Sequence, residues 1–201
     1  MRDFVTYLRR QPWHFALAWA LWWVLILLGL AWGGHVHGSG AMVQGMYGSS
    51  PINHALTSHL PAVLTIFVGN GIELSLWMLA VLVLAANKEA SPWVGKPLKA
   101  LVVLFLVVNL GLQGRVAWLA GAFFGANGGV RNLLGLPHGV LEFAAYALPL
   151  GLLLNVRHLP RERSGLLWAA WGSGLALLAA AAAVEVYVSP LVRAALHLPW
   201  A

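Results

Sequence analysis

Charged side chains are scarce in this sequence, and cysteine is absent. Only 9% of the 201 residues are Asp, Glu, Lys or Arg, whereas a globular domain has roughly a quarter. So few charges cannot cover a folded surface that faces water on every side, and this excludes a soluble domain. The lack of cysteine excludes disulfides, thiolate metal sites and a cysteine nucleophile.

Motifs for catalysis are also missing. Ser39 and Ser173 have glycine neighbours, but neither lies in a complete G-x-S-x-G turn. The sequence contains no H-E-x-x-H pair and no Walker A loop. We therefore expect no enzymatic activity and no cofactor.

Hydrophobic residues are abundant. They make up 60% of the chain, the mean hydropathy is +0.78, and 11 residues are Trp, which is enriched at membrane interfaces. A helix needs ~20 apolar residues to cross a hydrocarbon core of about 30 Å. The first run has a basic flank but is too long for a signal peptide core, so we expect it to be retained. The sequence predicts an all-α bundle in one membrane domain (residues 1–201), with spans at residues 13–32, 61–86, 98–125, 138–155 and 166–189 and an external Gly/His/Ser-rich loop at 33–60.

Lys and Arg in the loops predict the orientation of this bundle. Basic residues are enriched in cytoplasmic loops, and the split here is nine on one side against two on the other. The N-terminus is therefore expected in the cytoplasm and the C-terminus outside, in a plasma (inner) membrane. The nine are Arg2, Arg9, Arg10, Lys88, Lys96, Lys99, Arg157, Arg161 and Arg163, and the two are Arg131 and Arg193.

Reporter fusions test this orientation directly. Fusions after Glu89 and Glu162 should give a cytoplasmic signal, and a fusion after Ser49 should give an external one, because of the nine-to-two distribution. A cytoplasmic signal from the Ser49 fusion would overturn the predicted orientation.

The third apolar run is too long for one straight span, and it contains Arg115. One interpretation is a tilted or kinked helix in which Arg115 faces protein. The other is a full span followed by a re-entrant piece at residues 116–124, because helix breaks at membrane depth are tolerated where they are buried or line water. The first interpretation is preferred, and Glu73 is the expected partner of Arg115.

The loop at 33–60 contains histidines but no carboxylate. A metal site is one hypothesis, since imidazole is a common metal ligand. The spacing matches no closed zinc pattern, however, so a loop with unconnected histidines is preferred. The histidines in question are His35, His37, His54 and His59.

Several polar residues lie within the predicted spans, where an ionisable group is costly and usually faces protein or water. Asn70 and Glu73 are three residues apart and share one helix face, as do His138 and Glu142, four apart. Three interpretations stay open: a transport or proton pathway, a metal site, or polar pairing that joins helices.

His138, Glu142 and Glu185 are expected to form one cluster near the external interface. Pro137 and Pro190 would begin the fourth helix and end the fifth at that interface, which places both carboxylates about one turn deep. Because two close carboxylates repel when both are ionised, one should keep a proton or share a cation. Hydrogen-bonded pairing is preferred, and a metal ion bound by these three residues is the alternative.

Small residues mark packing faces. Ala117, Gly121 and Gly125 recur every four residues, which lets helix backbones approach closely. Packing within the chain is the preferred interpretation, and a homodimer contact is the alternative.

Three short motifs between residues 105 and 190 resemble a known family. A Pro-His-Gly triplet followed by Glu begins the fourth span, an Asn-Gly pair precedes it, and the fifth span ends with a Glu and, five residues later, a Pro. The motif residues are Asn127, Gly128, Pro137, His138, Gly139, Glu142, Glu185 and Pro190. The pattern resembles the stage II sporulation protein M family.

This resemblance implies a multi-pass plasma-membrane protein without catalytic activity, which acts as a scaffold in an envelope complex. A transporter or permease-like subunit is the alternative, because of the carboxylates within the spans. The expected partners are the lipid bilayer and other membrane proteins or a second copy. The formal charge of +6 does not predict nucleic-acid binding, since the basic residues lie at the ends of apolar runs.

Overall fold

The computed structural model describes residues 2–33, 61–87, 92–126, 129–159 and 164–198. Within these ranges the chain forms α-helices, two 3-10 turns and one π-helix, and it contains no strand. The elements are α1 (Arg2–Arg10), α2 (Pro12–Gly33), α5 (Ala62–Ala86), α6 (Pro92–Ala126), the 3-10 turn η1 (Gly129–Gly135), α7 (Pro137–Leu154), the 3-10 turn η2 (Val156–His158), α8 (Ser164–Ala183), the π-helix η3 (Val184–Val188) and α9 (Ser189–Ala195).

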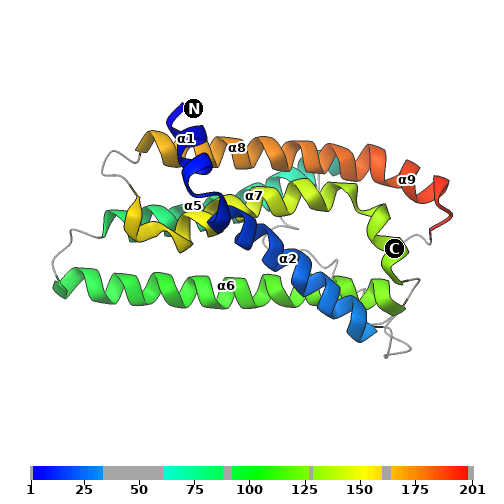
Figure 1. The fold of residues 1–201 in the computed structure, drawn as a ribbon, viewed down its shortest axis with the longest axis horizontal. Coiled ribbons are helices and arrows are strands. Elements are labelled where there is room, and N and C mark those ends of the chain that lie inside the picture. Colours follow the sequence, from blue (N-terminus) through cyan, green and yellow to red (C-terminus); the bar gives the residue numbers. More distant parts are fainter. Residues whose placement is uncertain (1, 34–60, 88–91, 127–128, 160–163, 199–201) are drawn as a thin grey trace.

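Five helices within the described ranges are long and apolar enough to cross a membrane, and the continuous segment of α8, η3 and α9 is one of them. The all-α bundle predicted from the sequence is therefore confirmed, and the chain is a multi-pass integral membrane protein. In Figure 1, α1 lies toward one end of the bundle, whereas η1 and α9 lie at the other end. Helices α5, α7 and α8 pack on one another, and α2 crosses obliquely to α6.

The crossing of α2 and α6 depends on two glycines. A Cβ at Gly29 would overlap the carbonyl oxygen of Trp118, and a Cβ at Gly121 would overlap that of Ile26. Because both positions lack a side chain, the two backbones come into direct contact. Ala117, one turn before Gly121, is buried against the same neighbour. The small-residue face of α6 thus packs within the chain, as the preferred interpretation predicted.

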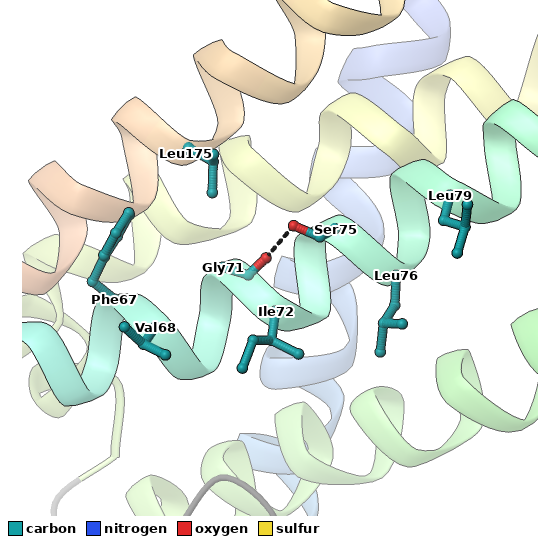
Figure 2. A pocket seen from close by; sticks show the side chains of 8 residues that line it. All are labelled: Phe67, Val68, Gly71, Ile72, Ser75, Leu76, Leu79 and Leu175. Carbon is teal, nitrogen blue, oxygen red and sulfur yellow. Dashed lines mark hydrogen bonds between the residues drawn. The ribbon is translucent and has the colours of Figure 1, made fainter. Parts of the chain in front are cut away.

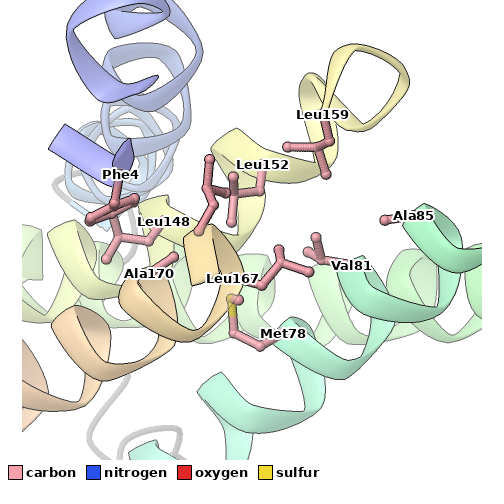
Figure 3. Close-up of a cluster of buried hydrophobic side chains, with 10 residues drawn as sticks. Phe4, Met78, Val81, Ala85, Leu148, Leu152, Leu159, Leu167 and Ala170 are labelled. Atoms are coloured by element: carbon pink, nitrogen blue, oxygen red, sulfur yellow. The ribbon is translucent and has the colours of Figure 1, made fainter. Parts of the chain in front are cut away.

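A second region of the core lies toward the end of the bundle with the N-terminus (Figure 3). Phe4 of α1 inserts between side chains of α7 and α8, such as Leu148 and Ala170. The amide of Asn155 donates a hydrogen bond of 2.7 Å to the hydroxyl of Tyr7. Burial raises the pKa of Tyr7 above its usual value of 10, so the phenol is neutral at physiological pH. These contacts fix the amphipathic α1 against the bundle.

The third apolar run forms one continuous helix. α6 is 35 residues long and passes through residues 111–115 without a break. The re-entrant piece considered for residues 116–124 is not formed, and the preferred long helix describes the structure.

Pro190 does not end the fifth span, contrary to prediction. The chain changes from α8 into the π-helix η3, in which the N–H of Ser189 bonds to the carbonyl of Val184, five residues earlier. A proline normally breaks an α-helix because its ring clashes with a carbonyl of the preceding turn. The wider π turn before Pro190 accommodates the ring, and α9 continues for seven residues. Pro137, by contrast, begins α7 as predicted.

Candidate functional site

A polar site lies between α5 and α7. The side-chain amide of Asn70 on α5 donates a hydrogen bond of 2.9 Å to Oε1 of Glu142 on α7. Glu73 is three residues after Asn70, and Tyr146 is four residues after Glu142, so each helix presents two polar side chains on one face. The i, i+3 spacing on α5 was recognised in the sequence, but the sequence did not show that Asn70 meets Glu142.

Tyr146 of α7 is also part of this site. It was not identified from the sequence as a site residue. Its hydroxyl lies 3.4 Å from the backbone carbonyl of Asn70 and 3.5 Å from Oε2 of Glu73. The signal that could have found it is its position one turn after Glu142. A buried tyrosine usually finds a partner for its hydroxyl, and here both acceptors lie on α5.

α6 contributes to the same site through amide side chains. The indole of Trp77 on α5 donates a hydrogen bond of 3.0 Å to Oδ1 of Asn109, and Trp77 and Gln113 lie beside the carboxyl of Glu73. Oε1 of Glu73 is nevertheless buried and accepts no hydrogen bond from the described part of the chain. Hydrogen bonds thus join α5 to both α7 and α6 at this site, while one oxygen of Glu73 stays without a partner among the described residues.

The predicted cluster of His138, Glu142 and Glu185 is only partly formed. Glu185, on η3, is close enough to Glu142 for their charges to interact, as is Glu73. His138 instead lies with Nδ1 3.0 Å from Oγ of Ser189, which joins the start of α7 to α9. Glu142 thus lies within electrostatic range of both other carboxylates, and the histidine pairs one turn nearer the end of the bundle.

The described residues contain no group of three His, Asp or Glu side chains arranged to hold a metal ion. The alternative of a metal bound by His138, Glu142 and Glu185 has no support from this geometry. Gly139, also part of the Pro-His-Gly motif, is buried in the first turn of α7 and packs near the ring of Phe143.

The position of Arg115 differs from the one predicted. It was expected to face protein and to pair with Glu73, but it lies on the exposed side of α6. Glu73 is directed instead toward Tyr146. The neighbouring residues Asn109 and Gln113 occupy the inward side of α6, and this rotation turns Arg115 away from the carboxylates.

Two groups of predicted residues lie outside the described ranges. They are the loop histidines His35, His37, His54 and His59, and Asn127 with Gly128 of the Asn-Gly pair.

Two pockets open on the surface of α5, and neither is lined by a carboxylate. The larger, of about 440 Å³, lies between α5 and Leu175 of α8 (Figure 2). Its only hydroxyl, on Ser75, donates to the carbonyl of Gly71 at 2.7 Å and accepts from the indole of Trp171 at 3.0 Å. The second, of about 260 Å³, is lined by Ser75 and by apolar or aromatic side chains of α5 and α8, together with Ser164. Both pockets are mostly apolar, and no residue of the polar site lines either of them.

Comparison of the chain with protein-family models, curated proteins and solved structures gives no match in any of the three. The resemblance to the stage II sporulation protein M family rests on the sequence motifs alone.

Proposed function

We propose that this protein is a non-enzymatic scaffold or assembly subunit of an envelope complex in the plasma (inner) membrane, of the stage II sporulation protein M type. The observation that supports this most is the contrast between a polar site paired inside the bundle and a long span, α6, left largely uncovered. Only 11% of the most apolar stretch of α6 is buried, against 50% for α7.

The pairing of the polar side chains favours a structural role. Asn70 with Glu142, Tyr146 with Glu73 and Trp77 with Asn109 join α5 to α7 and to α6. Such bonds between helices stabilise membrane bundles, where the alternative is a polar group left without a partner in hydrocarbon. The pockets on α5 do not reach these side chains, as a solute pathway through them would require.

Extraction from native membranes into lipid nanodiscs tests the scaffold. We expect the protein to migrate in a complex well above its own 21.6 kDa. Leu104→Trp, on the uncovered side of α6, should release the partner by steric clash, since Leu104 is 61% exposed. Leu28→Trp, at a comparably exposed position on α2, is the matched control and should leave the complex intact. A protein that migrates alone before any substitution would contradict the proposal.

Proton or cation movement is the second candidate, and one observation favours it. Oε1 of Glu73 has no hydrogen-bond partner in the described structure, and Glu73 and Glu185 both approach Glu142. Such intramembrane carboxylates mark ion pathways in many membrane proteins. Proton flux can be measured in proteoliposomes that contain the purified protein and a trapped pH-sensitive dye. Flux that the purified protein supports and that Glu142→Gln abolishes would favour transport over the scaffold.

A further inference from the structure

The uncovered side of α6 has a distinct composition. Leu104, Val108, Gly111, Leu112 and Arg115 are all exposed, and their spacing of three and four residues places them along one stripe of the helix. Most of the stripe is apolar, as expected for a face toward lipid. Gly111 and Arg115 are the exceptions, and they are adjacent, one turn apart.

Arg115 lies well inside the apolar span. It is ten residues from Gly125, where the apolar stretch of α6 ends, and this corresponds to ~15 Å at 1.5 Å per residue. Gln113, two residues earlier, lies beside Glu73, and Glu73 approaches Tyr146 at the midpoint of the 18-residue α7, so this arginine also begins near the middle of the hydrocarbon core. Arginine at that depth is rare and is almost always paired or directed into a protein interior. None of the hydrogen bonds or ion pairs of the described residues includes Arg115.

No carboxylate of the described spans pairs with Arg115. Glu73 and Glu142 are directed toward polar side chains inside the bundle, and Glu185 lies within electrostatic range of Glu142. The other three acidic residues lie outside the five apolar helices, and residues 33–60 contain none. These three are Asp3, Glu89 and Glu162.

A second copy does not fit this face either. Two copies in one membrane with the same orientation would pair through a two-fold axis, so that the same patch contacts itself. The two Arg115 side chains would then meet at the same depth and repel. The charge therefore selects a different partner, one with a negative group at this depth.

We propose that the stripe from Leu104 to Arg115 on α6 binds a transmembrane helix of another membrane protein that carries an Asp or Glu in its span. The carboxylate pairs with Arg115, in the bidentate geometry that arginine favours. Gly111 lies one helical turn before Arg115, and a Cβ built at this position would meet nothing within 4 Å. The missing side chain therefore lets the backbone of the partner helix come close to α6 at this level. This inference rests on the proposed scaffold function and identifies its partner by chemistry.

Photo-crosslinking in living cells tests the inference. A photoreactive amino acid replaces Val108 on the stripe, and a matched one replaces Leu28 on α2; both native side chains are about half exposed. We expect an adduct from position 108 to a span of another protein that contains Asp or Glu, and no such adduct from position 28. Arg115→Gln should reduce the adduct at least tenfold, whereas Arg115→Lys, which keeps the charge but loses the bidentate geometry, should reduce it less. The thermal midpoint of both variants should match the parent protein, because Arg115 is exposed.

The outcomes separate the inference from the proposed function. Adducts to phospholipid alone, to a second copy or to a span without an acidic residue would each overturn the inference, as would an adduct unaffected by Arg115→Gln. The acidic residue in the captured span is read from its peptide mass and does not depend on how the variants fold. If crosslinking contradicts the acidic partner helix while the native complex is still observed, the proposed scaffold function is retained, and the partner binds at a surface other than the stripe on α6. If the protein forms no complex at all in native membranes, both the proposed scaffold function and this inference are contradicted.

Discussion

Gly121→Ala is expected to lower the free energy of unfolding by about 3 kcal/mol or more, because overpacking at a rigid contact costs typically ~1–3 kcal/mol and the obstacle here is backbone. The added methyl group would overlap the carbonyl oxygen of Ile26, which cannot move without displacing α2. Since α6 packs mainly against α2, separating the two would detach the longest helix from the bundle. The thermal midpoint of the purified protein in nanodiscs measures the effect.

Gly172→Ala is the matched control for this substitution. A Cβ at Gly172 on α8 would meet nothing within 4 Å. Alanine in a helix interior is favoured over glycine by roughly 0.5–1 kcal/mol, so the control should be neutral or slightly more stable. Equal midpoints for the two variants would show that α2 and α6 do not cross as closely as described.

Glu142→Leu is expected to destabilise the protein by about 2 kcal/mol, the order of the cost of leaving a buried donor unsatisfied. The substitution removes the acceptor of the 2.9 Å bond from Asn70, and this bond joins α5 to α7. Glu142→Gln should be much milder, because its amide oxygen still accepts from Asn70. Denaturant titration of the reconstituted protein compares the two.

Combining Asn70→Leu with Glu142→Leu should recover part of the loss, because removing both partners leaves no unsatisfied group. The two single variants and the double variant form a cycle that isolates the coupling between the side chains. Strict additivity would contradict the bond. If Glu142→Gln proved as damaging as Glu142→Leu, the charge itself would be required, and the transport alternative would gain support.

The architecture was predictable because one physical rule determines it. A membrane span must be helical, since its backbone groups find no water to bond, and ~20 apolar residues must be present. The five runs therefore corresponded to five helices, including the one from Pro137 to Leu154. The continuation through Pro190 was not predictable, because it depends on the π turn at Val184–Val188, whose residues are ordinary apolar helix residues apart from Glu185.

The position of the polar residues along their helices could be predicted from the sequence, but the side of each helix that faces the bundle could not. Counting residues from Pro137 and Pro190 placed Glu142 and Glu185 at a similar level, and Glu185 does lie within electrostatic range of Glu142, although Pro190 is not the end of the fifth span. Which side of a helix faces lipid is harder to infer when most sides are apolar. On α6 the amides of Asn109 and Gln113 took the inward positions, and Arg115 was thereby directed outward. Tyr146 escaped notice because an aromatic residue in an apolar run gives no polar signal of its own.

The unequal lengths of α6 and α7 affect the surrounding bilayer. The membrane-length segment of α6, Gly95–Gly125, covers 31 residues, and its part after Lys99 still covers 26 residues, or ~39 Å, whereas α7 has 18 residues, or ~27 Å. Lipids contact α6 far more than the half-buried α7, so the longer helix dominates the hydrophobic mismatch at the protein boundary. α6 must tilt, protrude beyond the headgroups or thicken the bilayer beside it, each at a modest energetic cost. This mismatch favours the thicker regions of a membrane.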